Sequence, residues 1–269
     1  MIAFYNELAE YLPSPRLIFL NYGIAEPDES CYAWIRPGDR IHKYHLSLVR
    51  RVLDGVGLEG KSILEIGSGR GGNCYYLDRY TRARQIYGLD LCEANVRFCL
   101  RAYPGTRVRF LRGDSQDLPL ADASLDVVLN LESSHCYADF GRFLAEVWRV
   151  LKPGGVFAYA DFWYLNILPL DWQARRQTLL ASPFQLLAEE DITWQVSRAL
   201  KDGDGLSRSL LAMENRRNSA FVRHVVQCNR AMRLTLASGQ CRYNIWKFRK
   251  PSVQPAPPAP SAENWKGVP

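Results

Sequence analysis

A glycine-rich stretch lies between a short apolar run and a helical segment of the 269-residue chain. Its sequence is Glu65-Ile66-Gly67-Ser68-Gly69-Arg70-Gly71-Gly72. Glycines at such a place let the backbone approach a ligand closely and leave the next helix N-terminus facing it. Gly67, Gly69 and Gly72 also fit the G-x-G-x-x-G spacing of dinucleotide sites. Alone, this spacing leaves a tight packing turn as the alternative.

Acids around this loop discriminate between a nicotinamide dinucleotide and S-adenosylmethionine. A dinucleotide places a pyrophosphate on the helix N-terminus, whereas S-adenosylmethionine has a sulfonium and an amino-acid end that a nearby carboxylate suits. Glu65 precedes the first glycine by two residues. Asp90 ends the second predicted strand, where a carboxylate can bind both ribose hydroxyls, and Asp114 ends the third, where it can accept from the adenine amino group. Together with Leu151-Lys152-Pro153-Gly154-Gly155, these acids predict S-adenosylmethionine as the cofactor.

The end of the fourth predicted strand carries an amide, a carboxylate, two hydroxyls, an imidazole and a phenol. The segment is Asn130-Leu131-Glu132-Ser133-Ser134-His135-Cys136-Tyr137. A sulfonium already activates its methyl group, so an enzyme must mainly align the nucleophile and remove its proton. His135 suits a hydroxyl acceptor as general base because an unperturbed imidazole has a pKa of about 6.5. Glu132 can orient that imidazole or act as the base itself. The alternatives are a histidine bonded to backbone and an acid favoured by a helix dipole.

Strand and helix signals alternate through the middle of the chain. The predicted strands are 62–66, 85–90, 108–112, 125–130, 156–160 and, at the sheet edge, 242–248. The predicted helices between them include 75–80, 93–103 and about 140–151, and a tight turn is expected at 152–155. This alternation is typical of an α/β, doubly wound, mostly parallel sheet, whose ligands bind at the carboxyl ends of the strands. All the candidate residues above are therefore expected at one edge.

Longer segments flank the predicted core. We divide the chain into an N-terminal helical arm at 1–60, a cofactor-binding core at 61–161, a mostly helical lid insertion at 162–218, a C-terminal end of the sheet at 219–250 and a disordered tail at 251–269. The arm and the insertion are expected to enclose an apolar pocket because they are rich in aromatic residues. These residues are Trp34, Phe162, Trp163, Tyr164, Trp172 and Trp194. The alternative is that they pack the extra helices on the sheet.

With these motifs, the sequence resembles the class I S-adenosylmethionine-dependent methyltransferases over residues 61–161. Residues 19–23, 130–137 and 159–161 are further similar to phthiotriol and phenolphthiocerol dimycocerosate methyltransferases, and the resemblance spans about 17–249. It implies a Rossmann-like sheet of seven strands and S-adenosyl-L-methionine as the cofactor. Related enzymes methylate lipids, polyketides and terpenoid or indole metabolites, so the acceptor is not implied. The expected cofactor-binding residues are Glu65, Gly67, Ser68, Gly69, Asp90, Leu91, Asp114, Ser115, Gln116 and Asn130, and the catalytic candidates are Glu132 and His135.

Composition narrows the class of protein. Residues 201–250 hold eleven Lys or Arg against three Asp or Glu, within a chain of net charge +6. Such clustering suits nucleic acid, anionic lipid or a phosphorylated substrate, with solvated helix faces as the alternative. Seven cysteines without a CxxC pair indicate reduced thiols and a cytoplasmic location. Apolar runs are too short for stable membrane insertion, and no metal-binding motif occurs.

These observations predict a methyltransferase that acts on a hydrophobic small-molecule acceptor, a small or lipidic natural product, at a hydroxyl oxygen. The first alternative is C-methylation of an isoprenoid, including a prenyl diphosphate, or of an indole. A nucleic-acid methyltransferase is disfavoured by the missing Asn/Asp-Pro-Pro-Tyr segment, and nucleic acid is not an expected partner. An NAD(P) oxidoreductase is disfavoured by Glu65 and Asp114. The sequence leaves open whether the chain forms a homo-oligomer.

Overall fold

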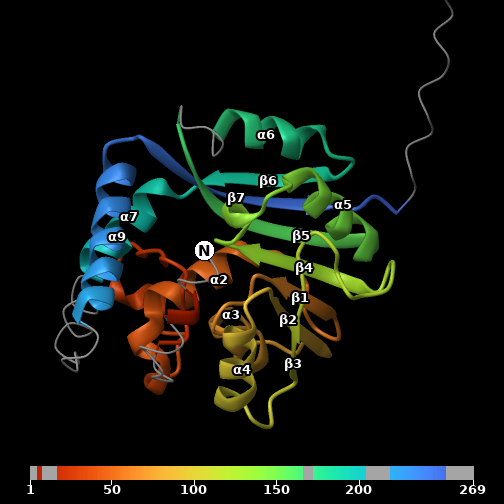
Figure 1. The fold of residues 1–269 in the computed structure, drawn as a ribbon, viewed down its shortest axis with the longest axis horizontal. Helices are drawn as coiled ribbons and strands as arrows, with labels where there is room; N and C mark the ends of the chain where they lie inside the picture. The colour runs from red at the N-terminus through yellow and green to blue at the C-terminus, as the bar shows by residue number, and fades with distance from the viewer. Residues whose placement is uncertain (1–4, 8–16, 166–171, 204–218, 253–269) are drawn as a thin grey trace, which may run out of the picture.

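A seven-stranded sheet forms the centre of the protein (Figure 1). The structure, a computed structural model, describes residues 5–7, 17–165, 172–203 and 219–252, without the side chains of 219–222. The strands are β1 (Ser62–Ile66), β2 (Gln85–Asp90), β3 (Val108–Arg112), β4 (Leu125–Leu131), β5 (Leu151–Tyr164), β6 (Gln185–Asp191) and β7 (Cys241–Arg249). Their order across the sheet is β3-β2-β1-β4-β5-β7-β6.

The first five strands pair in parallel, and β7 runs antiparallel to both β5 and β6. Every residue of β1 is buried, as expected for a central strand with helices on both faces. The strand order reverses at β1, which has β2 on one side and β4 on the other. Such a reversal opens a crevice at the carboxyl ends of the strands. The expected doubly wound, mostly parallel sheet of seven strands is confirmed.

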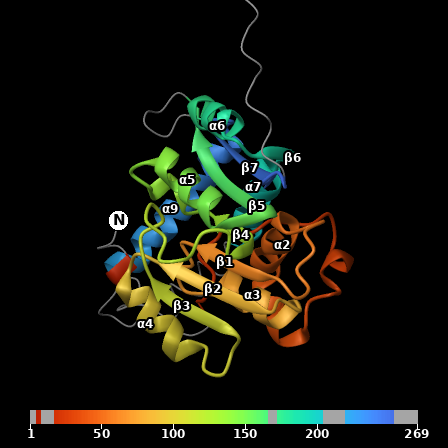
Figure 2. The ribbon, with the colours of Figure 1, turned by 90° about the vertical axis from the view of Figure 1, so that its right-hand side faces the viewer.

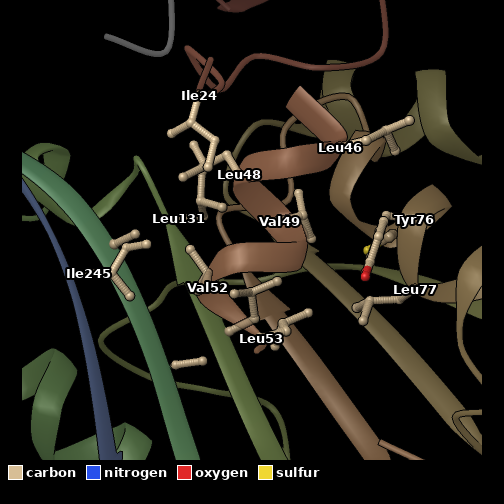
Figure 3. Packing of buried hydrophobic residues seen from close by; sticks show 14 of the residues in the cluster. Ile24, Leu46, Leu48, Val49, Val52, Leu53, Tyr76, Leu77, Leu131 and Ile245 are labelled. Atoms are coloured by element: carbon tan, nitrogen blue, oxygen red, sulfur yellow. The ribbon is translucent and has the colours of Figure 1, made fainter. Parts of the chain in front are cut away.

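Helices cover both faces of the sheet. They are η1 (Glu29–Tyr32), η2 (Pro37–His42), α2 (Lys43–Val52), α3 (Gly72–Tyr80), α4 (Glu93–Ala102), η3 (Ser134–Cys136), α5 (Phe140–Val150), α6 (Trp172–Ala181), α7 (Thr193–Asp202) and α9 (Ser219–Ala237). Helices α2 and α3 lie on one face, and α5 and α6 lie on the other (Figure 2). In the first of these layers, Leu48, Val49 and Val52 of α2 pack towards Leu131 and Ile245 of the sheet (Figure 3).

One prediction about local structure was wrong, and one strand was not predicted. Residues 152–155 do not separate two elements, because β5 starts at Leu151 and contains them as an irregularity where its register with β4 shifts. The insertion at 162–218, expected to be mostly helical, contains helices α6 and α7 and also the strand β6, which was not predicted. Most side chains of β6 are exposed because it is the edge strand, so its sequence lacks a buried apolar run. Residues 204–218 and all but the first two residues of the tail lie outside the described residues.

Candidate active site

A cavity of about 560 Å³ lies at the carboxyl ends of β1, β2, β3 and β4, where the strand order reverses. Its walls come from the glycine loop, from the segments after β2, β3 and β4, and from the N-terminal part of the chain. The lining residues are Tyr5, Leu20, Asn21, Ile66, Gly67, Ser68, Gly69, Asn73, Leu89, Asp90, Leu91, Cys92, Gly113, Asp114, Ser115, Gln116, Leu131, Glu132, Ser133, Cys136, Tyr137 and Ala138. The predicted site residues are thus mostly brought together, with three exceptions: Glu65, Asn130 and His135.

The glycine loop needs its glycines for two physical reasons. Gly67 and Gly69 have φ angles of +73° and +52°. At such positive φ angles, the backbone of a residue with a side chain is strained. A Cβ at Gly67 would lie 2.3 Å from Ser133 Oγ, and one at Gly69 would lie 2.9 Å from Leu20 Cδ1. A side chain at either position would therefore displace the cavity wall. The loop forms a close backbone cradle of the kind that a cofactor requires.

Asp90 holds the glycine loop from the end of β2. Its Oδ2 accepts from the Gly69 amide at 2.7 Å, and its Oδ1 accepts from the Cys92 amide at 2.8 Å and from Asn95 Nδ2 at 3.3 Å. Burial raises the pKa of Asp90, although these hydrogen bonds oppose the change. The carboxylate therefore lies in the cavity wall, and hydrogen bonds to both of its oxygens hold it in position.

Asp114 and Gln116 form a second polar group, after β3. Asp114 Oδ1 accepts from the Gln116 amide at 2.9 Å and from Gln116 Nε2 at 3.2 Å. Gln116 Oε1 in turn accepts from the Asp139 amide at 2.6 Å, at the start of α5. The loop after β3 is therefore fastened to α5, which positions the adjoining Ser115 in the wall.

Glu65, predicted to contact the cofactor, does not line the cavity. It is buried, and it accepts from Asn73 Nδ2 at 2.6 Å and from Cys74 Sγ at 3.0 Å. Burial raises the pKa of Glu65 to about 7 despite these bonds. Asn73 does line the cavity, and its Oδ1 accepts from Asn21 Nδ2 at 2.9 Å. Glu65 therefore positions two amides, Asn73 and Asn21, that the sequence did not single out as site residues.

Asn130 is the second predicted residue outside the cavity wall. It is fully buried, and its Nδ2 lies 3.0 Å from the carbonyl oxygen of Ile66, 2.8 Å from Ser133 Oγ and 2.9 Å from Tyr137 Oη. These bonds join the end of β1 to the segment after β4. Asn130 thereby holds the wall formed by Ser133 and Tyr137 in place.

Glu132 lies in the cavity wall in an unfavourable backbone conformation. Its φ angle is +51°, one of two positive values among the described non-glycine residues. Its Oε1 accepts from the Tyr22 amide at 2.8 Å and from Tyr243 Oη at 2.7 Å. Burial raises the pKa of Glu132 to about 8, although both bonds oppose the change. Strain of this kind is usually retained where a function requires it.

His135 forms a pair with Asp161, an acid within the buried part of β5. His135 Nδ1 lies 2.8 Å from Asp161 Oδ1, and Asp161 Oδ2 accepts from the His135 amide at 3.1 Å and from Ser134 Oγ at 2.7 Å. Burial lowers the pKa of His135, but the charge and hydrogen bond of Asp161 outweigh it and hold this pKa well above its usual value. The centroid of its ring lies 4.4 Å from that of Phe162, and the adjacent Cys136 lines the cavity whereas His135 does not. Asp161 had no assigned role in the sequence.

The expected aromatic lid is only partly present. The N-terminal segment does contribute Tyr5, Leu20 and Asn21 to the cavity. None of the six aromatic residues named for the lid lines it. Trp163 is fully buried in the sheet core, whereas Trp194 is 65% exposed on the surface. The insertion therefore packs its aromatic side chains elsewhere, because β6 joins the sheet edge instead of folding over the strand ends.

Comparison with known proteins identifies the family. Residues 64–159 match the model of a methyltransferase domain. The chain is 35% identical over 252 residues to the phthiotriol/phenolphthiotriol dimycocerosates methyltransferase of Mycobacterium tuberculosis, covering 91% of this chain and 90% of that protein. The chain belongs to this methyltransferase family. It is also 36% identical over 211 residues to a fatty-acid O-methyltransferase of Mycolicibacterium smegmatis, covering 78% of this chain and 73% of that one.

Solved structures agree on the fold. Geranyl diphosphate C-methyltransferase from Streptomyces coelicolor A3(2), with S-adenosyl-L-homocysteine in its crystal structure, superposes with a TM-score of 0.65 at 16% identity, covering 92% of this chain and 98% of that one. The predicted S-adenosylmethionine-dependent methyltransferase and its cofactor, S-adenosyl-L-methionine, are confirmed. Membership of this family removes the oxidoreductase alternative.

The described residues bear on two further expectations. No helix among them is long and apolar enough to cross a membrane. Within the same part of the chain, no three His, Cys, Asp or Glu side chains are grouped so that they could hold a metal ion.

Proposed function

We propose that this methyltransferase transfers its methyl group to an oxygen atom of a lipidic or small natural product, with His135 as the base. The pairing of His135 Nδ1 with Asp161 is the observation that carries this proposal. Asp161 orients the ring and stabilises the imidazolium that forms when Nε2 takes a proton. The relative named as a fatty-acid O-methyltransferase supports a lipid oxygen as the acceptor, although a fatty-acid carboxylate has no proton for His135 to remove.

The cofactor would be held by the residues that line the cavity at the ends of β1, β2 and β3. From the predicted set these are Gly67, Ser68, Gly69, Asp90, Leu91, Asp114, Ser115 and Gln116. When bound, S-adenosyl-L-methionine supplies a methyl group activated by its positive sulfur. Glu65 and Asn130 act indirectly, the first by holding Asn73 and the second by holding Ser133 and Tyr137.

Glu132 is assigned to the acceptor side of the cavity. Its segment follows β4, and its Oε1 is fixed by the Tyr22 amide and Tyr243 Oη. Because the pKa of Glu132 is about 8, the carboxyl is mostly protonated near neutral pH and can donate a hydrogen bond to an acceptor oxygen. In this scheme Glu132 orients the oxygen while His135 removes its proton.

C-methylation is the alternative, and one observation favours it. Glu132 lines the cavity, whereas His135 does not. When a carbon acceptor attacks, a cation forms on the acceptor, and the carboxylate of Glu132 stabilises it electrostatically once ionised, above its pKa of about 8. Glu132 would then be the more important group. The two proposals differ in which substitution lowers the rate more.

Two variants separate these proposals. For an oxygen acceptor, His135→Gln is expected to lower kcat by about 10²–10⁴, more than Glu132→Gln. The rate of Glu132→Gln, which has no carboxyl at this position to ionise, should rise with pH because the raised pKa of His135 must be passed. Long-chain alcohols, long-chain fatty acids and geranyl diphosphate serve as acceptors, with the methylated atom identified by mass spectrometry. The loss of rate in His135→Gln is expected for the alcohols, because a fatty-acid carboxylate is already ionised. His224→Gln, on the exposed face of α9, is the matched control. Methylation at carbon, or methylation of an alcohol by His135→Gln at the wild-type rate, would refute the first proposal.

A further inference from the structure

Helices α7 and α9 pack side by side and form a second, shallower pocket of about 370 Å³, outside the active-site cavity (Figure 1). We call this pocket and the exposed side chains around it the α7–α9 surface. Trp194, Arg198 and Lys201 of α7 and Arg233 of α9 form its walls. None of these residues takes part in the chemistry proposed above.

The charge of this surface is almost entirely positive. Helix α9 holds three arginines and no acid in 19 residues, and α7 holds two cations and Asp202. Asp202 lies 3.8 Å from Arg198. Within the described part of the chain, no ion pair neutralises Lys201 or Arg233, and the buried Nε of Arg233 lacks a hydrogen-bond partner. The two helices carry a net charge of +4, and the pocket itself is lined by three of the cations, Arg198, Lys201 and Arg233, against one acid, Asp202. These donors suit a phosphate-type anion.

Large apolar side chains accompany these cations. Trp194 is 65% exposed, and Leu234 on α9 is 52% exposed. The guanidinium of Arg198 lies 5.4 Å from the centroid of the Trp194 ring. An exposed Trp among Lys and Arg is the combination that favours the interface between a bilayer and water, where the indole and the cations meet the head groups. A soluble phosphate would need the cations but not the exposed Trp194 and Leu234.

We propose that the α7–α9 surface docks on an anionic lipid bilayer and holds a lipid phosphate in its pocket. Trp194 and Leu234 enter the head-group layer, while Arg198, Lys201 and Arg233 neutralise the phosphates. The Ala25 amide donates to the Gln195 carbonyl at 3.1 Å, which links α7 to the N-terminal segment that reaches the active-site cavity. Docking therefore places the methyltransferase where lipidic acceptors reside. This last consequence rests on the proposed function, whereas the docking itself does not.

The test measures co-sedimentation of the full chain with vesicles, without cofactor or acceptor. We expect binding to phosphatidylcholine vesicles that contain phosphatidylglycerol, no binding to phosphatidylcholine alone, and weakening at high salt. One Lys or Arg near such a surface contributes about fivefold in affinity, so Arg198→Gln with Lys201→Gln should weaken binding about 25-fold. Trp194→Ala should weaken it as well. The controls are Arg82→Gln and Leu100→Ala, because these side chains are exposed and do not line the α7–α9 pocket.

Several outcomes would overturn the proposal. Unchanged binding in the Arg198→Gln, Lys201→Gln variant, or equal weakening by Arg82→Gln, would show that net charge alone attracts the protein. Release from the vesicles by low inorganic phosphate would assign the pocket to a soluble anion. Tighter binding to single-stranded RNA, lost in the same variants, would assign it to nucleic acid. Thermal unfolding shows that each variant is folded, and Trp194→Ala gives an independent readout because it removes no charge.

Discussion

Glu132 combines a positive φ with a carboxyl whose charge is unfavourable in the folded state. Its pKa is 4.5 in an exposed setting and about 8 in the protein, so the folded chain binds this proton more tightly than the unfolded chain. The contribution of Glu132 to the free energy of unfolding therefore falls as pH rises from about 4.5 to about 8. Glu132→Gln removes this pH-dependent loss of stability, because a glutamine side chain does not ionise.

We expect Glu132→Gln to be more stable than the wild type near pH 8, with a smaller difference near pH 5. Urea unfolding at both pH values measures this difference in the free energy of unfolding. Glu59→Gln is the control, because its side chain is 77% exposed and no burial effect should appear. A stability difference for Glu132→Gln that is independent of pH would contradict the burial of its charge.

A second prediction concerns the cradle of the glycine loop. Gly67→Ala is expected to abolish S-adenosylhomocysteine binding and to destabilise the fold, because its Cβ would approach Ser133 Oγ to 2.3 Å. Gly60 is a matched control: its φ is +70°, and a Cβ there would meet nothing within 4 Å. Gly60→Ala should therefore show only the backbone strain, about 1–2 kcal/mol. Calorimetric titration and thermal unfolding of both variants separate the backbone strain from the steric clash. Equal losses of binding and stability in Gly67→Ala and Gly60→Ala would contradict the predicted clash.

At the scale of elements, α5 shows how a helix start supports the site. Asp139 Oδ1 accepts from the Arg142 amide at 2.9 Å and caps the helix, while the Asp139 amide donates to Gln116. Asp139→Ala should lower the free energy of unfolding by about 1 kcal/mol. Asp139→Asn should retain most of the stability because Asn is an equally good cap. Urea unfolding measures the free energy of unfolding of both variants. Equal stability of Asp139→Ala and Asp139→Asn would show that the side chain of Asp139 does not stabilise α5 as a cap.

The elements that the sequence predicted correctly are strands whose buried residues follow one another along the chain. β1, β2 and β4 combine short apolar runs with a following turn or helix, so their sequences alone located them. β6 was missed because an edge strand with exposed side chains has no apolar pattern. The bulged start of β5 was taken for a turn because Pro153 and Gly154 are typical of both structures.

The candidate site was predictable where its residues follow strand ends, and not where contacts cross the chain. Asp90 and Asp114 end strands that must share one edge, so their meeting followed from topology. Asn21 and Asn73 lie 52 positions apart and meet only after α3 and the N-terminal segment pack together. Asp161 likewise reaches His135 from a different strand. No local pattern indicates such pairs.

At the scale of the whole molecule, cofactor binding should stabilise the fold. S-adenosylhomocysteine at about a hundredfold excess over its Kd is expected to add about 2.7 kcal/mol to the free energy of unfolding. NADH should leave Tm unchanged, because this family binds S-adenosyl-L-methionine. A thermal-shift comparison of the two ligands measures the difference. An equal shift with NADH would mean that the cavity does not discriminate between the two.

The position of β7 has a consequence for synthesis of the chain. β7 is the last described strand, yet it lies inside the sheet between β5 and β6. On the ribosome, β5 therefore waits with one unpaired edge, and β6 waits without a neighbour, until Cys241–Arg249 emerges. An unpaired edge of a strand as apolar as β5 is a template for association with other nascent chains. Translation that stops before β7 should thus yield aggregating fragments, and chaperones are needed most just before this strand appears.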